Sequence, residues 1–233
     1  MLKTVVIDAG HGGKDPGCLG SHSMEKNIAL DVALQLGKLI ERLQPDIHVI
    51  YTRTSDTFIP LERRADIANK AGADLFISIH CNAHQSKEKF GTETYIMGLH
   101  VSKSNLRVAM RENSVILQEN NHQKKYKGFN PNSPASYILL SNLQSAHQDN
   151  SLLLAHKIEG RFHHESARHS RGVKQSGFWV LARTGMPSVL VEIGFLTNPE
   201  EEKYLNTELG KASMAASLYR AFRDYRKALE KTK

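Results

Sequence analysis

Two histidines and two glutamates stand at predicted strand ends, inside a strand or at the start of a helix: His11, Glu25, His80 and Glu192. In open α/β sheets the carboxyl ends of parallel strands form the ligand crevice, so residues far apart in the sequence can meet there. Two neutral imidazoles and one carboxylate form a good catalytic zinc site and leave a fourth position for water. Glu25 stays ionised at a helix N-terminus because the helix dipole favours negative charge, and a metal binds the ionised form. The four residues therefore indicate one metal site.

Glu192 stands inside the apolar run SVLVEIGF, where a charge is costly unless it has a partner or a catalytic task. An ion pair with an arginine such as Arg183 is the structural alternative. His84 follows the second histidine by four residues, but a strand before it gives the two side chains no common face, so His84 is not expected to be a ligand. Surface solvation is expected for the histidines of a basic stretch, His163, His164 and His169.

Other polar residues near the site allow more than one interpretation. Asn82 could hydrogen-bond the substrate or simply close the turn after its strand. Arg63 could contact the substrate, and Arg63 and Arg64 could equally be solvated charges. One of these two arginines could instead pair with Asp8 or Asp66.

Strand-like and helix-like segments alternate along the chain, which is typical of parallel βαβ units. The run TVVID at residues 4–8 ends in the glycine-rich turn AGHGG and predicts the first strand. From residue 23 apolar residues recur at three and four residue steps, which predicts a helix with Ser23 as its N-cap and Pro45 as its stop. We expect further strands at 48–51, 75–79, 91–97, 177–181 and 188–193, and further helices at 61–71, 152–162 and 207–229. The strand at 91–97 mixes polar and apolar residues, which favours a sheet edge.

The alternation is interrupted at about residues 100–150. Residues 102–119 are compatible with a polar helix, and residues 120–134 are rich in Asn, Lys and Pro, which predicts a loop. This segment is longer than an ordinary connection, so we interpret it as an insertion in a single domain that spans residues 1–233.

Composition narrows the range of partners. The chain has 31 Lys and Arg against 24 Asp and Glu, and its formal charge of +7 favours a polyanionic partner such as nucleic acid or anionic cell wall. The basic residues are scattered and lack the aromatic interleaving of a nucleic-acid reader, so no nucleic-acid partner is expected.

The longest apolar runs are far shorter than a membrane span, and the sequence shows no signal-peptide pattern. Cys18 and Cys81 are too few for a disulfide framework and could be two thiols or a single bridge.

The joint pattern resembles the zinc-dependent N-acetylmuramoyl-L-alanine amidases over nearly the whole chain. The blocks that carry the resemblance are VVIDAGHGGKDPG (5–17), EKNIALDVALQLGKLI (25–40), TRTSD (52–56), PLERRADIAN (60–69), FISIHCNA (76–83) and MPSVLVEIGFLTNPEEEKYL (186–205). The resemblance implies that His11, Glu25 and His80 hold one Zn²⁺ and that Glu192 is the catalytic carboxylate. In that role Glu192 takes the proton of the attacking water and delivers it to the leaving nitrogen.

The same resemblance implies a fold and a function. The fold is a phosphorylase/hydrolase-like α/β domain, with a central, mostly parallel sheet of about six strands between helices. The function is hydrolysis of the amide bond between N-acetylmuramic acid and the L-alanine of the stem peptide in peptidoglycan. That reaction belongs to cell-wall remodelling and cell separation, in the periplasm or elsewhere in the cell envelope.

Several relatives carry, at the position of the insertion, a helix that covers the zinc site until a partner protein releases it. Here Arg111, Glu112, Asn113 and Glu119 could supply such a plug, with Glu112 as the first choice. The alternative is a wall of the substrate groove or a surface loop.

Two other classes of function remain open at this point. The same site could belong to another zinc peptidase or carboxypeptidase. The chain could also be a non-catalytic peptidoglycan-binding module, although such a module has no need for a general base at Glu192.

Overall fold

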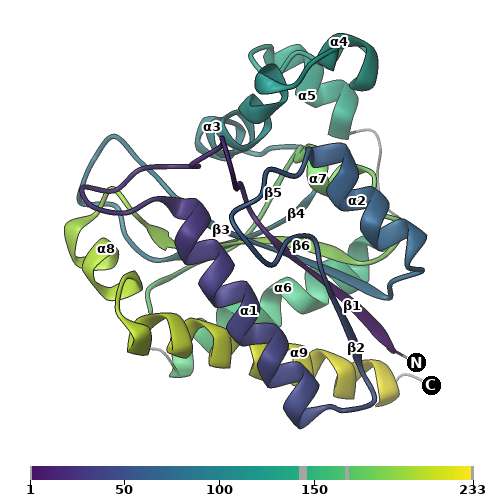
Figure 1. Cartoon of the computed structure of the whole chain (residues 1–233), viewed down its shortest axis with the longest axis vertical. Coiled ribbons are helices and arrows are strands. Elements are labelled where there is room, and N and C mark those ends of the chain that lie inside the picture. The colour runs from purple at the N-terminus through teal and green to yellow at the C-terminus, as the bar shows by residue number, and fades with distance from the viewer. Residues whose placement is uncertain (1, 142–145, 166–167, 232–233) are drawn as a thin grey trace.

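Six strands form one sheet in the order β2-β1-β3-β6-β4-β5 (Figure 1). The computed structural model describes residues 2–141, 146–165 and 168–231. Only the β4–β6 pairing is antiparallel among the strands of the described residues. The strands are β1 (Thr4–Ala9), β2 (His48–Tyr51), β3 (Leu75–Asn82), β4 (Thr92–Met97), β5 (Ser170–Ser176) and β6 (Ser188–Phe195). The predicted α/β class with a mostly parallel six-stranded sheet is therefore confirmed.

Helices cover both faces of this sheet (Figure 1). One face carries α1 (Glu25–Leu43), α6 (Gln148–Glu165) and α9 (Glu208–Lys231), whose apolar side chains join those of the strands in one core cluster. The other face carries α2 (Leu61–Lys70) and α7 (Trp179–Ala182), and α8 (Pro199–Leu205) follows β6. No helix of the described residues is both long and apolar enough to cross a membrane.

The fully buried strand β3 shows how the sheet directs its side chains. Ile77, Ile79 and Cys81 belong to the core under α1, α6 and α9. Because successive side chains of a strand point to opposite faces, Ser78 and His80 point the other way. Ser78 Oγ accordingly donates to the Asp8 carboxylate of β1 at 2.6 Å. Strands β3 and β1 thus place polar groups on the same face of the sheet.

Three sequence predictions about elements were wrong. Strand β4 lies inside the sheet, although its polar residues suggested an edge. Thr92 and Thr94 can be buried there because their hydroxyls donate hydrogen bonds to the buried carboxylate of Glu159. The outer strand next to it is β5, which the sequence did not indicate because its residues are mostly polar. Residues 177–181 contain α7 in place of a strand. Finally, Ser23 does not cap α1, since its hydroxyl donates to Glu202 instead.

The segment at about 100–150 folds into α3 (Lys103–Asn113), η1 (Ser114–Gln118), α4 (His122–Lys125) and α5 (Pro134–Ser141). In Figure 1 these elements lie together above the sheet, at the top of the molecule. The part expected to be a loop, residues 120–134, is packed against the domain, since Tyr126 belongs to the core cluster on the α2 and α7 side and Phe129 packs against it.

Candidate active site

The turn after β1 presents His11 to the site. His11 adopts a left-handed backbone conformation with φ of 59°, which is uncommon for a residue with a Cβ. Arg64 of α2 holds this turn, because its Nη2 donates to the His11 carbonyl at 2.7 Å and its Nη1 donates to the Asp8 carboxylate at 2.8 Å. Gly10 is needed beside it, since a Cβ there would lie 2.4 Å from the His80 ring. The turn therefore leaves room for the His80 ring to lie close to the His11 ring.

Four side chains converge at this point. The nearest nitrogens of the two rings, His11 Nε2 and His80 Nδ1, lie 3.1 Å apart. Glu25 Oε1, from the first residue of α1, lies 3.0 Å from each of these nitrogens. Glu112 Oε2, from α3, lies 3.1 Å from His11 Nε2 and 3.0 Å from His80 Nδ1. The structure thus brings together three residues that the sequence proposed as ligands and adds a fourth donor.

This donor set fits a tetrahedral metal ion. The four candidate ligand atoms lie within 4.8 Å of one another, and all four residues are buried. Ligands at about 2.0 Å from a zinc ion lie roughly 3.3 Å apart in a tetrahedron. The separations of 3.0–3.1 Å between the histidine nitrogens and the two carboxylate oxygens are close to this value. Nitrogen and carboxylate oxygen donors suit zinc among the common divalent metals.

Neighbouring groups fix the orientation of these donors. Asp15 Oδ2 lies 2.7 Å from His11 Nδ1, the ring nitrogen that faces away from the cluster. The two Glu25 oxygens accept from the backbone amides of Cys18 and Cys81, each at 2.8 Å. Hydrogen bonds of this kind hold a ligand in place and set the histidine tautomer. Both cysteines are free thiols, so the alternative of a bridge between them is not formed.

The charges of the cluster favour a cation. Burial alone would lower the pKa of His11, but the Glu25 carboxylate, with hydrogen bonds that the ring donates to Asp15 and Glu112, raises the pKa well above its ordinary value. Burial acts in the same way on His80, and there Glu112 outweighs it and raises the pKa to about 9. The carboxylates therefore stabilise positive charge at this point, which a divalent cation can supply in place of protons.

Glu192 stands next to the cluster on β6. In the register of β3 and β6 its partner is His80, so the two side chains are neighbours on one face of the sheet. Its Oε1 accepts from Arg111 Nη2 at 3.2 Å, while its buried Oε2 has no hydrogen-bond partner among the described residues. Burial and the nearby carboxylates of Glu112 and Glu25 raise its pKa well above the ordinary range, although Arg111 opposes them. Such a carboxyl group is suited to exchanging a proton.

Comparison with known proteins decides the family. The family model described as N-acetylmuramoyl-L-alanine amidase matches residues 5–224. AmiA of Escherichia coli K12, named as such an amidase, is 33% identical over 219 residues, which cover 93% of this chain and 73% of AmiA. The chain belongs to the N-acetylmuramoyl-L-alanine amidase family.

Two solved amidase structures share the whole fold. The N-acetylmuramoyl-L-alanine amidase of Clostridium difficile 630 is 28% identical, has a TM-score of 0.73 and is matched over 97% of each chain. The CwlD amidase of Clostridioides difficile, solved in complex with the GerS lipoprotein, is 25% identical with a TM-score of 0.72, over 97% of this chain and 99% of CwlD.

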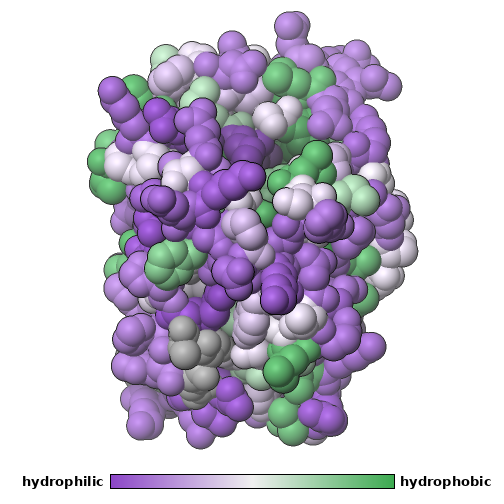
Figure 2. Space-filling model, turned by 90° about the vertical axis from the view of Figure 1, so that its left-hand side faces the viewer, coloured by the Kyte–Doolittle hydropathy of each residue, from purple (hydrophilic) through white to green (hydrophobic). Residues whose placement is uncertain are grey.

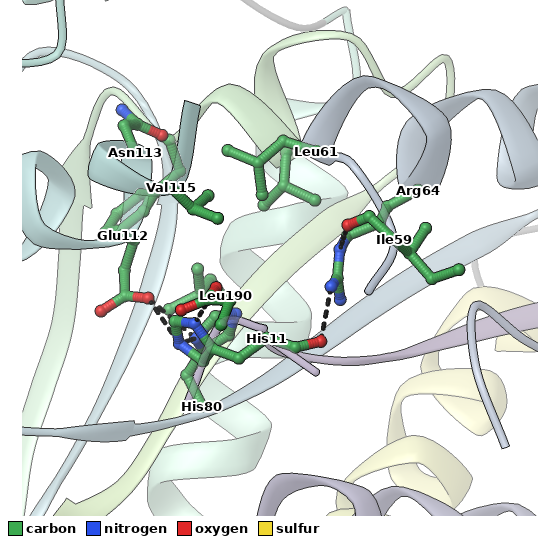
Figure 3. Close-up of a pocket in the computed structure, with 12 residues that line it drawn as sticks. His11, Ile59, Leu61, Arg64, His80, Glu112, Asn113, Val115 and Leu190 are labelled. Carbon is green, nitrogen blue, oxygen red and sulfur yellow. Dashed lines mark hydrogen bonds and ion pairs between the residues drawn. The ribbon is translucent and has the colours of Figure 1, made fainter. Parts of the chain in front are cut away.

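In this member of the amidase family, α3 covers the cluster. Figure 3 shows Glu112 above the two histidines, with dashed contacts to their rings. The cavity beside the histidines has a volume of about 10 Å³, which is no more than one water molecule occupies. Arg111 lies next to it and donates from Nε to Glu112 Oε1 at 2.8 Å and from Nη2 to Glu192. Asn113 lines the same cavity, but its side-chain amide is hydrogen-bonded to the backbone of Gly177 and Trp179. The Glu119 carboxylate accepts from the Tyr126 hydroxyl.

The remaining sequence candidates lie at different distances from the cluster. Asn82 is buried at the end of β3, where its Oδ1 accepts from Arg111 and its Nδ2 donates to Glu93. Arg63 is exposed on α2, and a role in substrate binding stays a prediction. The backbone amide of His84 donates to Thr197, and its ring is not part of the cluster.

Arg183 pairs with Glu62 and not with Glu192. Sequence periodicity gave no signal for Arg111 as the partner of Glu192, because the two residues are 81 positions apart.

Proposed function

We propose that this chain is a zinc-dependent hydrolase that cleaves the amide bond between N-acetylmuramic acid and the L-alanine of the peptidoglycan stem peptide. The observation that carries the proposal is the buried set His11, Glu25 and His80, with the unpartnered carboxylate oxygen of Glu192 beside it. Its membership of the N-acetylmuramoyl-L-alanine amidase family supports the choice of substrate.

Each residue then has a defined task. His11, Glu25 and His80 hold the metal, and Asp15 with two backbone amides keeps them oriented. Bound zinc supplies Lewis-acid polarisation of the scissile carbonyl and a water of lowered pKa. Glu192 takes the proton of the attacking water and gives it to the leaving nitrogen, so one carboxyl group serves both steps.

We further propose that α3 inhibits this site in the resting chain. Glu112 occupies the fourth donor position, and Arg111 pairs with Glu192 at the same time. Withdrawal of α3 would remove both contacts together, exposing the metal and releasing the proton-transfer group. A partner protein is a suitable means of withdrawal, and the relative CwlD was crystallised with the GerS lipoprotein. The substrate places this activity in the periplasm or elsewhere in the cell envelope, where it would serve wall remodelling and cell separation.

Mass analysis of peptidoglycan fragments tests the proposed reaction. The zinc-loaded protein, the protein treated with a chelator and the Glu192→Gln variant are incubated with the same peptidoglycan. Because the resting chain is proposed to be inhibited, Glu112→Gln is included as a fourth sample. We expect intact stem peptides that begin with L-alanine, together with peptide-free glycan, and none of these after chelation.

The other two classes of function give different products. Release of a carboxy-terminal amino acid alone would identify a carboxypeptidase. Binding without any new fragment, in both the parent and Glu112→Gln, would identify a binding module. Either result would overturn the amidase proposal.

A further inference from the structure

A second cavity, of about 270 Å³, adjoins the site on β4 and β5. Asn82 and Arg111, which contact each other beside Glu192, form part of its lining. The remaining walls come from the loop after β3, from α3 and from the two strands. Figure 2 shows the side of the molecule that lies at the left of Figure 1, and hydrophilic residues predominate on it. The volume is just below the range of about 300–1,000 Å³ that is usual for ligand pockets, so it suits a short segment of a substrate.

The lining of this cavity is strongly cationic. Among the described residues that line it, five carry a positive charge and one carries a carboxylate. The cations are Lys89, Arg107, Arg111, Arg171 and Lys174. The carboxylate is Glu93, whose Oε1 accepts from Arg171 at 2.8 Å and from Lys174 at 2.5 Å. Lys89, Arg171 and Lys174 lie outside α3, and together they face the single Glu93 carboxylate. These three cations outnumber that carboxylate whether or not α3 is in place, so the cavity attracts an anionic ligand.

The register of the sheet relates the cavity to the reaction. His80 of β3 is paired with Glu192 of β6, and Glu192 is in turn paired with Glu93 of β4. The metal ligand, the proton-transfer group and the cavity carboxylate therefore form one row across the sheet. In the proposed reaction Glu192 protonates the leaving nitrogen, which is the amino terminus of the stem peptide. The cavity on the far side of Glu192 from His80 is thus on the peptide side of the scissile bond.

We propose that this cavity is a subsite for the carboxylate groups of the stem peptide, an inference that rests on the proposed function. Lys89, Arg171 and Lys174 are the residues that bind the carboxylates, because Arg107 and Arg111 leave with α3 when the site opens. The Arg171 guanidinium has the planar geometry that suits a carboxylate. No ion pair ties Lys89 to a carboxylate in the described part of the chain, so its charge is available to a ligand. Tyr95 and Phe195 in the lining offer contact to the aliphatic parts of the peptide.

Direct binding of a peptide tests the subsite without any turnover. The probes are the dipeptide L-Ala-D-Glu, which carries two carboxylates, and its diamide, titrated calorimetrically into the full chain. We expect the acid to bind roughly tenfold more tightly than the diamide, and more weakly as salt is raised. Lys89→Ala and Lys174→Ala should each weaken binding of the acid by roughly threefold to fivefold and leave binding of the diamide unchanged.

Control variants separate this subsite from general charge and from misfolding. Lys38→Ala removes the same charge from the exposed surface of α1 and should bind the acid like the parent. Lys174→Arg keeps the charge beside Glu93 and should retain binding. If both Lys174 variants lower the Tm, their binding reflects loss of stability, and Lys89→Ala decides the test. Equal binding of acid and diamide, or a parent-like Lys89→Ala, would overturn the subsite. Competition by inorganic phosphate at concentrations similar to those of the dipeptide would show a general anion site and would also overturn it. None of these outcomes depends on amide hydrolysis, so a failure here is distinct from a failure of the proposed reaction.

Discussion

Glu112 Oε2 lies 3.0 Å from His80 Nδ1, although Glu112 comes from α3 and His80 comes from β3 inside the sheet. Both side chains are buried, with 6% of His80 and 4% of Glu112 exposed. A carboxylate at this distance from both histidines takes the position that a catalytic zinc site keeps open for water and substrate. The contact therefore connects α3 directly to the site.

The first prediction is that Glu112→Gln raises basal hydrolysis of peptidoglycan. The amide keeps the size of the side chain but removes the negative charge that faces His11 and His80. Couplings between a regulatory contact and a site are usually 1–3 kcal/mol, or about 5-fold to 150-fold, so we expect an increase of roughly tenfold or more. Release of soluble wall fragments per unit time measures it.

A matched control is available in the same segment. Glu119 is also buried, but it bonds Tyr126 and Lys125 and not the metal cluster. Glu119→Gln should therefore leave the rate unchanged. An unchanged or lower rate in folded Glu112→Gln would show that α3 is a wall of the substrate groove and not a plug.

The second prediction concerns the metal content of ligand variants. Replacement of His11, Glu25 or His80 by Ala removes one donor, so zinc content and activity should fall together. Glu112→Gln is the comparison, because a plug residue is not required for metal binding. Metal analysis after dialysis measures the occupancy, and full zinc occupancy in His80→Ala would contradict the assignment.

The third prediction separates Glu192 from the ligands. Glu192→Gln should keep the fold and the zinc, since a proton-transfer group does not have to hold the metal. Turnover should fall by roughly a hundredfold or more, the usual scale for losing a general acid or base. The comparison is best made in the Glu112→Gln background, in which we expect the site to be open. Turnover close to that of the background would assign proton transfer to another group.

Most of the fold could be predicted because alternating strand and helix patterns cover most of the sequence. The strand ends that carry His11 and His80, and the helix start at Glu25, grouped these residues at one site, and the resemblance to the amidase family assigned them as ligands. The errors have a physical origin in buried polar contacts. Thr92 and Thr94 look like edge residues until the Glu159 carboxylate that satisfies them is known.

The contact between Arg111 and Glu192 depends on tertiary structure, so it could not be predicted from the sequence. Glu112 was proposed from the resemblance to relatives, but its neighbour Arg111 was assigned no contact with Glu192. A helical residue 81 positions before its partner leaves no periodic signal. The packing of residues 120–134 was also missed, because a short loop-like stretch gives no sign that Tyr126 is buried against Trp179.

The last prediction concerns Arg64, which connects the stability of the domain to the position of His11. Its guanidinium is buried and donates to the Asp8 carboxylate and to three backbone carbonyls, including that of His11. Arg64→Ala leaves the Asp8 charge buried without this partner, so we expect a loss of about 3–5 kcal/mol in the free energy of unfolding. Zinc affinity should also fall, because the turn that presents His11 loses its support.

Arg63→Ala is the matched control, since it removes the same charge from the adjacent position of the same helix, where the side chain is exposed. Denaturant unfolding should place this variant within about 0.5 kcal/mol of the parent. The double variant Asp8→Asn with Arg64→Met should recover part of the lost stability, because neither member of the pair is then left as an unpaired buried charge. If Arg64→Ala unfolds like Arg63→Ala, the buried pair does not support the turn. Other contacts then hold the left-handed conformation of His11, among them the hydrogen bond from Arg53 to the Gly10 carbonyl and the contact of the His11 ring with Asp15.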